Sequence, residues 1–210
     1  MVNNFEHIKD FLVMKGLPLN ADKQKAEDMY FTVEIVKRAK DHKEIGSNNY
    51  HFKNYYITSI EKLEFYKDEI VTLCETFGMR AYISVNKKSF KKVALNTVAE
   101  MCRLMSNDDF RRPYRVFESC SGKYLDNTDK TWVVDVDADQ LDHLDAIRDM
   151  VVSCYDGKSN PIVFENPTNS GMHLITKPFN SLLFTSLAMN AGIKVPDIKK
   201  NHLTALYANI

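Results

Sequence analysis

Two carboxylates follow a short apolar run within residues 131–139. The run Trp132–Val134 predicts a buried strand, and Asp135 and Asp137 stand at positions i and i+2 directly after it. Side chains two residues apart on a strand point to the same face, so these carboxylates are held side by side. They repel each other unless a proton or a cation lies between them, and their hard oxygen atoms suit Mg²⁺ or Mn²⁺. The alternative is a strand that ends in a solvated helix start, with Asp139 as the N-cap.

Two later segments carry residue types that could act together with these carboxylates. In Ser170–His173 a turn delivers a histidine onto a strand, and in Val195–Asp197 an aspartate lies on or beside a late strand. Taken alone, these are a hydrogen-bonded strand histidine, an ordinary hairpin turn and a loop carboxylate. Lys177 shares the face of His173 if the strand continues that far, which makes it a candidate phosphate contact. Pro178 favours an end to the strand there, so a solvated lysine is the alternative.

The second half of the sequence predicts strands and helices that would position these groups. Apolar residues at helical spacing favour helices, and runs of β-branched and aromatic residues favour strands. In chain order we expect a strand at 80–85, a helix at 88–105, a short strand at 116–120, the strand at 132–134, a helix at 139–153, strands at 161–165 and 172–176, a helix at 179–191, and strands at 193–198 and 203–207. This order predicts an α+β fold, a mixed sheet with helices on one face.

Residues 1–79 predict an N-terminal module of a helix, a β-hairpin and a second helix. The first helix covers 3–15, the hairpin strands cover 29–38 and 50–58, and the second helix starts at the capping-box pattern of 58–61 and stops before Gly78. Several basic residues gather near the hairpin tip, namely Lys37, Arg38, Lys40, His42 and Lys43. A solvated loop explains them, and a contact with nucleic acid is the alternative.

Two more basic groups flank the helix expected at 88–105. Its first turns carry Lys87, Lys88, Lys91 and Lys92, and the irregular stretch after it carries Arg111, Arg112 and Arg115. Lysines at a helix N-terminus interact unfavourably with the helix dipole, which costs a little stability. Such a cluster therefore suggests a function, such as binding a phosphate-bearing partner. A solvated basic face is the alternative.

Length and composition exclude several protein classes. A chain of 210 residues with 28 basic and 28 acidic side chains forms one domain, or one core with a small appendage, and its net charge indicates no partner. The four cysteines are far apart, without zinc-ligand spacing, which favours reduced thiols. No signal peptide and no run of 18 apolar residues is present, so we expect a cytoplasmic protein outside the membrane.

The order of the acidic and histidine segments resembles the archaeo-eukaryotic primase and primase-polymerase superfamily. That superfamily has an apolar strand ending in D-x-D, then a small residue-x-His, then an apolar residue-Asp. Here VVDVD at 133–137, GMH at 171–173 within NSGMHLITKPF, and VPD at 195–197 follow in the same order. The sequence is similar to short phage and mobile-element members over about residues 80–210. Its turn before the histidine is more compact than in many members, and Pro196 is unusual within a strand.

This resemblance implies an RRM-like, primase-type catalytic core at 80–210 and a metal-dependent nucleotidyltransferase that makes or extends nucleic acid on a template. It implies Mg²⁺ or Mn²⁺ on Asp135, Asp137 and Asp197. It also implies triphosphate contacts from His173, Ser170 and Gly171, with Lys177 as a further candidate. The basic residues expected to face template or nucleotide phosphates are Lys87, Lys88, Lys91, Lys92, Arg111 and Arg112.

The implied partners are nucleoside triphosphates and a DNA or RNA template. The sequence shows no helicase part, so a helicase or another replication protein would supply unwinding. Two other functions fit the same acidic face. One is a DNA- or nucleotide-binding accessory protein of the same fold without turnover, and the other is a metal-dependent nuclease or phosphohydrolase. A calcium-binding EF-hand does not fit, because Gln140 and Ala146 stand where its loop needs glycine and glutamate.

Overall fold

The computed structural model describes residues 1–20, 28–110, 115–123 and 129–209. Up to residue 123 its elements are β1 (Val2–Asn3), α1 (Phe5–Met14), β2 (Met29–Lys37), the 3-10 helix η2 (Lys43–Ile45), β3 (Tyr50–Ile57), α2 (Ile60–Phe77), β4 (Arg80–Ser84), β5 (Lys88–Ser89), α3 (Phe90–Ser106) and α4 (Val116–Lys123). Then follow β6 (Trp132–Val136), the 3-10 helix η4 (Ala138–His143), α5 (Leu144–Ser153), β7 (Ile162–Pro167), β8 (Met172–Thr176), α6 (Ser181–Asn190), β9 (Asp197–Lys199) and β10 (Leu203–Ala208). These elements confirm the α+β class.

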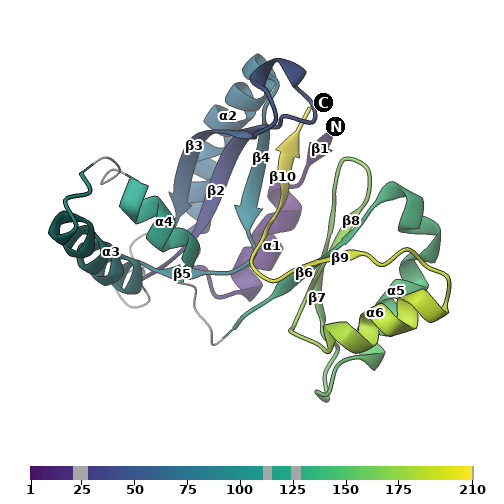
Figure 1. Ribbon diagram of the computed structural model, residues 1–210. Helices are drawn as coiled ribbons and strands as arrows, with labels where there is room; N and C mark the ends of the chain where they lie inside the picture. The colour runs from purple at the N-terminus through teal and green to yellow at the C-terminus, as the bar shows by residue number, and fades with distance from the viewer. Residues whose placement is uncertain (21–27, 111–114, 124–128, 210) are drawn as a thin grey trace.

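The strands form two sheets, and every pairing among the described residues is antiparallel (Figure 1). The first sheet has the order β1-β10-β4-β2-β3, with β5 beside β2, and the second has the order β7-β8-β6-β9. The prediction of a mixed sheet is therefore wrong. Strand β10 lies between β1 and β4, so the first sheet takes strands from both sides of the expected module boundary at residue 80.

The first sheet is covered by helices on both faces, which corrects the expectation of helices on one face. Strand β2 alternates, so Phe31 and Val33 join the core formed with α1 and α2, whereas Tyr30 points to the other side. There Tyr30 stacks on Phe90 at a centroid distance of 4.1 Å and donates to the Ser121 hydroxyl on α4.

The second sheet follows the order β6-α5-β7-β8-α6-β9, a βαββαβ unit. Val134 and Leu174 pack against α5 and α6 on one face, whereas Val133 and Ile175 join the core of the first sheet. Asp135 shares its face with Val133, because both are odd positions on one strand. The polar residues of this face therefore look toward the first sheet.

Several local predictions are corrected by the structure. The segment 116–120, expected as a strand, is helix α4, in which Val116 and Cys120 stand four residues apart and both pack near Tyr30. The helix expected at 139–153 begins as the 3-10 helix η4 and becomes α5 only at Leu144. The N-cap of α2 is Ser59, whose side chain accepts from the Lys62 backbone N–H.

All four cysteines lie in the described part of the chain and are free thiols, as expected. Across residues 1–20, 28–110, 115–123 and 129–209, no helix is both long enough and apolar enough to span a membrane.

Candidate active site

Three sequence segments meet in one row across the second sheet. Asp135 on β6 lies directly opposite His173 on β8 and directly opposite Asp197 on β9. Residues opposite each other on antiparallel strands point to the same face. The expected convergence of these segments on one sheet face is therefore confirmed, whereas their catalytic roles stay a prediction.

The Asp135 carboxylate has a partner on each oxygen. Its Oδ1 lies 3.2 Å from His173 Nε2, and its Oδ2 accepts from Lys199 Nζ at 2.5 Å. The hydrogen bond from His173, followed by that from Lys199, outweighs partial burial and holds the pKa of the Asp135 carboxyl well below its usual range. Asp135 is therefore a firmly ionised carboxylate at the centre of the row.

The His173 ring is fixed from the first sheet. Its Nδ1 lies 2.9 Å from the Thr204 hydroxyl on β10, and the same hydroxyl accepts from the Asn166 side-chain amide at 2.7 Å. All three side chains are buried. Because Thr204 already accepts from Asn166, we infer that its O–H donates to Nδ1, which leaves the Nε2–H to face Asp135.

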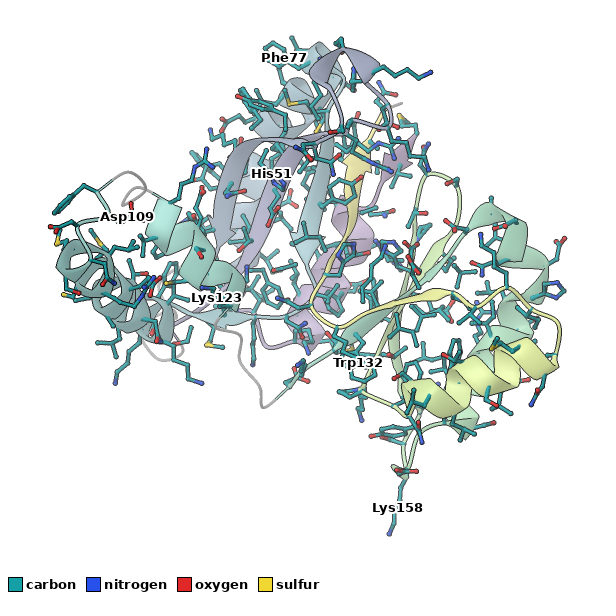
Figure 2. All side chains as sticks on the ribbon, in the orientation of Figure 1. His51, Phe77, Asp109, Lys123, Trp132 and Lys158 are labelled. Atoms are coloured by element: carbon teal, nitrogen blue, oxygen red, sulfur yellow. The ribbon has the colours of Figure 1, made fainter. Side chains whose placement is uncertain are left out.

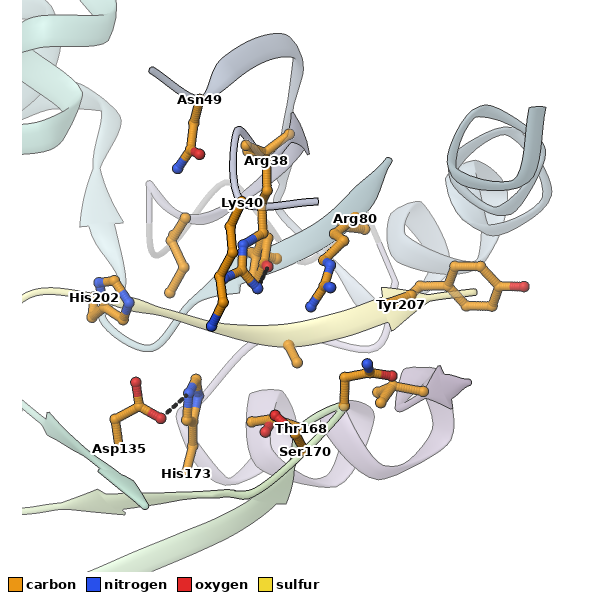
Figure 3. Close-up of a pocket in the computed structure, with 18 of the residues that line it drawn as sticks. Arg38, Lys40, Asn49, Arg80, Asp135, Thr168, Ser170, His173, His202 and Tyr207 are labelled. Atoms are coloured by element: carbon orange, nitrogen blue, oxygen red, sulfur yellow. Dashed lines mark hydrogen bonds and ion pairs between the residues drawn. The ribbon is translucent and has the colours of Figure 1, made fainter. Parts of the chain in front are cut away.

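A cavity of about 420 Å³ opens between the two sheets at this row (Figure 3). Asp135, Asp137 and His173 line its side on the second sheet, and Arg38, Lys40 and Arg80 line its side on the first sheet. Figure 3 shows the Lys40 side chain extending toward Asp135 and His173. The cavity thus has an acidic wall opposite a basic wall, an arrangement that suits a cation together with phosphate groups.

The three basic residues on the first-sheet side of the cavity differ in how firmly neighbouring groups hold them. Arg80 Nε lies 2.8 Å from Asp41 Oδ2, and both side chains are largely buried. Arg38 NH1 donates to the Tyr82 hydroxyl at 3.5 Å. Lys40 is exposed, and within the described residues it has no ion-pair partner. Lys40 is thus a cation on the cavity with its charge still available.

His202 adds a neutral donor and acceptor to the cavity rim. It lines the cavity beside Lys199 and Leu203. Burial lowers the pKa of His202 to about 4, so the ring carries no charge near neutral pH.

The turn before His173 approaches the end of β6 very closely. A Cβ atom on Gly171 would lie 2.1 Å from the carbonyl oxygen of Val136, a distance that real Cβ atoms do not show. The Gly171 carbonyl oxygen accepts from the Thr168 backbone N–H at 2.9 Å, and Ser170 lines the cavity from the tip of the turn. Gly171 is therefore needed for close packing, which places Ser170 at the cavity.

The two outer carboxylates are less constrained than Asp135. Asp137 lines the cavity, its side chain is 65% exposed, and Lys194 Nζ lies 3.5 Å from its Oδ2. Its backbone N–H donates to Gln140 Oε1 at 2.9 Å, which anchors the start of η4. Asp197 is exposed at the start of β9 and does not line the cavity.

The carboxylates expected to bind a divalent metal ion are not assembled around one in this structure. Asp135 Oδ2 accepts from the Lys199 ammonium, so this carboxylate is already paired within the protein. Among the residues that the structure describes, no group of three or more His, Cys, Asp or Glu side chains is gathered closely enough to hold a metal. Binding would therefore require Asp137 or Asp197 to move toward Asp135.

Lys177 lies apart from the cavity. Its Nζ donates to the Ser159 hydroxyl at 2.9 Å, at the opposite end of β8 from the turn that carries Ser170. Ser159 is next to Lys158, which projects from the far end of the second sheet in Figure 2. The structure therefore places Lys177 at a strand end and brings it to none of the triphosphate candidates.

The basic residues expected at the start of α3 divide into separate environments. Lys88 is buried, and its Nζ donates to Thr32 Oγ1 at 3.0 Å and to Ser121 Oγ at 3.5 Å. Lys87 is half-buried, with Nζ 3.4 Å from the Lys15 carbonyl oxygen, whereas Lys91 and Lys92 are exposed. None of these four lysines lines the cavity. Of the arginines, Arg115 is exposed, and Arg111 and Arg112 lie outside the described residues.

Sequence reasoning missed four residues of this site, namely Arg80, Lys199, His202 and Thr204. Lys199 follows Asp197 by two residues on one strand, so strand alternation was a usable signal for it. Arg38 and Lys40 belong to the predicted basic hairpin tip, but no local pattern indicates that they turn toward the acidic strand.

Comparisons of the chain with protein-family models, with curated proteins and with solved structures find no match.

Proposed function

We propose that this protein is a metal-dependent nucleotidyltransferase of the primase-polymerase type. The observation that carries the proposal is the row of Asp135, His173 and Asp197, which brings together three segments far apart in sequence, with Asp135 and His173 lining a charged cavity. The βαββαβ order of the second sheet supports an RRM-like, primase-type core.

The acidic wall would hold the metal and the attacking group. Asp135, Asp137 and Asp197 would supply carboxylate oxygens to Mg²⁺ or Mn²⁺, which when bound neutralises phosphate charge and activates the attacking hydroxyl. The ionised state of Asp135 supports this role, because a metal ligand must be deprotonated.

Both sides of the cavity would hold the triphosphate. Ser170 would donate to its oxygens from the second sheet, and His173 would do so once its Nε2–H turns from Asp135 to a phosphate oxygen, while Gly171 would permit the turn to approach. Arg38, Lys40 and Arg80 extend this set from the first sheet, so residues before and after position 80 would act on one substrate. The exposed Lys91 and Lys92, together with Arg111, Arg112 and Arg115, are left as candidates for contacts with a DNA or RNA template.

The proposal is tested by nucleotide incorporation. The full chain is incubated with single-stranded template, labelled nucleotides and Mn²⁺, beside Asp135→Asn and the control Asp142→Asn. Asp142 is an exposed acid in η4 that does not line the cavity. Labelled polymer from the wild type and from Asp142→Asn, with none from Asp135→Asn, is the expected result. No polymer from the wild type on any template would contradict the proposal.

A second candidate function is the binding of nucleotide or nucleic acid without turnover. It is favoured by the ion pair between Asp135 and Lys199, which satisfies this carboxylate within the protein. This function predicts nucleotide binding that weakens as salt rises, with no incorporation of nucleotide into a polymer. Cleavage of unprimed DNA, without extension, would instead indicate a nuclease.

A further inference from the structure

Helix α3 packs against the rest of the protein along one side. All 17 of its residues are described, and Val93 is the one that is buried. Around Val93, the partly buried Phe90, Met101 and Leu104 pack against the cluster at Tyr30. Figure 1 shows α3 at the edge of the molecule, on the far side of the first sheet from the second sheet. Most of the surface of α3 therefore faces away from the protein.

A second apolar stripe runs along the outward side of this helix. Its members are Leu95, Val98, Cys102 and Met105. Leu95 is 63% exposed, Val98 is 62% exposed and Met105 is 51% exposed, and Cys102 is an exposed free thiol. The members are spaced by three, four and three residues, like the a and d positions of a heptad, which lie on one line along a helix. An exposed apolar stripe with this spacing is the kind of surface through which two helices pair.

We propose that this stripe joins two copies of the protein, whose α3 helices pair in antiparallel orientation about a twofold axis near residue 100. The inference goes beyond the proposed function and does not depend on it. All of α3 is described, and none of its residues lines the cavity. Each copy would therefore keep its cavity open in the dimer.

The side chains of the stripe complement themselves in this arrangement. Antiparallel pairing about residue 100 sets Leu95 opposite Met105 of the second copy. It also sets Val98 opposite Cys102 of the second copy. The larger side chains thus meet at the two ends of the stripe, and the smaller ones meet at its centre. One patch that fits a second copy of itself is what a twofold dimer requires.

Charges at the two ends of α3 select the antiparallel orientation. Lys91 lies in line with the stripe, four residues before Leu95. Asp108 and Asp109 follow shortly after the last residue of the helix. A parallel pair would bring like charges together at both ends. An antiparallel pair brings each Lys91 toward the acidic end of the other helix and sets the two helix dipoles in opposite directions, which is favourable.

The charged residues in the middle of α3 lie away from the stripe. Arg103 Nε donates to Glu100 Oε2 at 2.8 Å, and Arg103 NH2 donates to Glu100 Oε1 at 2.7 Å. By helical geometry this ion pair lies on another side of the helix from Val98 and Cys102. The stripe is therefore apolar between ends of opposite charge. An anionic lipid surface would be repelled by the acidic end, so a second copy is the occupant that matches both ends.

The first test measures self-association of the full chain under reducing conditions. Four apolar side chains from each copy make a small interface, so the dimer is weak and its population rises with protein concentration. Sedimentation velocity from about 5 to about 500 µM should show an equilibrium between monomer and dimer. Val98→Glu places a carboxylate at the centre of the stripe and should weaken dimerisation at least about tenfold.

The matched control is Leu182→Glu on α6, where Leu182 is 84% exposed. It introduces the same charge at an exposed apolar position and should change the dissociation constant less than about twofold. A wild type that stays monomeric at the highest concentration, or a dimer that Val98→Glu leaves unchanged, would overturn the proposal. A monomer that instead binds anionic lipid vesicles, and loses that binding in Val98→Glu, would identify a membrane surface as the occupant and overturn the dimer.

Cross-linking tests the orientation of the two helices. Leu95→Cys and Met105→Cys are each combined with Cys102→Ala, and the three other cysteines are buried. Under mild oxidation, an intermolecular disulfide should form when the two variants are mixed and in neither variant alone. In the antiparallel pair the two copies of position 95 are about 15 Å apart along the helix axis, too far for a disulfide. Cross-links within each variant alone would indicate a parallel pair and overturn the antiparallel arrangement.

Charge reversal at the first turn of α3 tests the contact between the helix ends. Lys91→Glu should weaken dimerisation about three- to tenfold at low salt, and the loss should shrink as salt rises. Lys92→Glu, at the neighbouring lysine outside the line of the stripe, should change it less than about twofold. Because glutamate in the first turn favours the helix itself, a weaker dimer of Lys91→Glu would not come from a weaker helix. Equal losses in both variants would contradict the contact between Lys91 and the acidic end.

Discussion

The Thr204 hydroxyl on β10 lies 2.9 Å from His173 Nδ1 on β8, and this contact joins the two sheets inside the protein. Thr204 lies next to Ala205 on a strand of the first sheet, whereas His173 belongs to the row on the second sheet. The orientation of the site histidine is therefore set by a residue that pairs with β4. Any change at Thr204 should reach Asp135 through the ring.

Replacing Thr204 with valine should destabilise the protein and disturb the site together. Valine keeps the shape but removes the hydroxyl, which leaves His173 Nδ1 without its partner and the Asn166 amide nitrogen with only the Ala205 carbonyl oxygen as acceptor. Unsatisfied buried polar groups of this kind cost about 1–3 kcal/mol in the free energy of unfolding. Urea denaturation measures the loss, and Thr204→Ser, which keeps the hydroxyl, should lose much less. Equal loss in both variants would show that the methyl group matters rather than the hydrogen bond.

Gly171→Ala should be strongly unfavourable compared with an alanine substitution at another glycine. The new Cβ would lie 2.1 Å from the Val136 carbonyl oxygen, so either the turn or the end of β6 must shift. We expect a loss of about 1–3 kcal/mol in the free energy of unfolding. Gly122→Ala is the matched control, because Gly122 lies in α4 and no atom comes within 4 Å of an added Cβ. It should be neutral or stabilise by about 0.5–1 kcal/mol. A small effect at Gly171 would show that the turn adapts.

Lys40→Gln should weaken binding of inorganic tripolyphosphate, about three- to tenfold at low salt. Lys40 lines the cavity and has no ion-pair partner in the described residues, so its charge is available to a phosphate. Lys43→Gln makes the same change of charge on the same hairpin without touching the cavity. Isothermal titration calorimetry compares the two variants, and the difference should shrink as salt rises. If both variants bound tripolyphosphate equally weakly, the loss would come from the change in net charge and not from a contact at Lys40.

Lys88 should make stability increase with pH in the alkaline range. Burial lowers the pKa of Lys88 to about 8, below the ordinary value of about 10.4 in the unfolded chain. Between these values the unfolded state binds the proton more tightly, so the free energy of unfolding rises as the pH rises. The wild type should gain up to about 2–3 kcal/mol relative to Lys88→Met between pH 8 and pH 10.

The control for this pH effect is Lys91→Met, at an exposed lysine three residues further along the chain. Relative to Lys91→Met, the wild type should show no change over the same range, and chemical denaturation at each pH measures both differences. If the difference in free energy of unfolding between the wild type and Lys88→Met did not change with pH, the Lys88 ammonium would be solvated in the folded protein.

The row at Asp135 could be predicted from sequence because it depends on local rules. Alternation along β6 and β8 fixes which residues share a face, and the order of the segments suggested which strands meet. The registers of Asp135 with His173 and with Asp197 agree with that expectation. The basic tip of the hairpin could also be predicted from sequence, because its charged residues cluster near Lys40 along the chain.

Other features depend on which surfaces pack together, which a single sequence does not reveal. The short run 116–120 has too few residues to show a period, and its contact with Tyr30 selects a helix. Lys88 falls in a basic group that looks solvated, yet β5 pairs with β2 and carries the lysine inward. Thr204 lies on a strand that was expected, but nothing local indicates that this strand belongs to the other sheet.

The position of β10 between β1 and β4 has a consequence for biosynthesis. While the ribosome adds the residues that follow β4, the β4 edge that will pair with β10 has no strand beside it, and β1 has no sheet to join. The first sheet can close only after residues 203–208 have emerged. The nascent chain therefore carries an open strand edge from the synthesis of β4 until β10 emerges, and pairing across such a large sequence separation is slow. Such an edge is also a template for association with other chains, so we expect this protein to depend on protection of that edge before release.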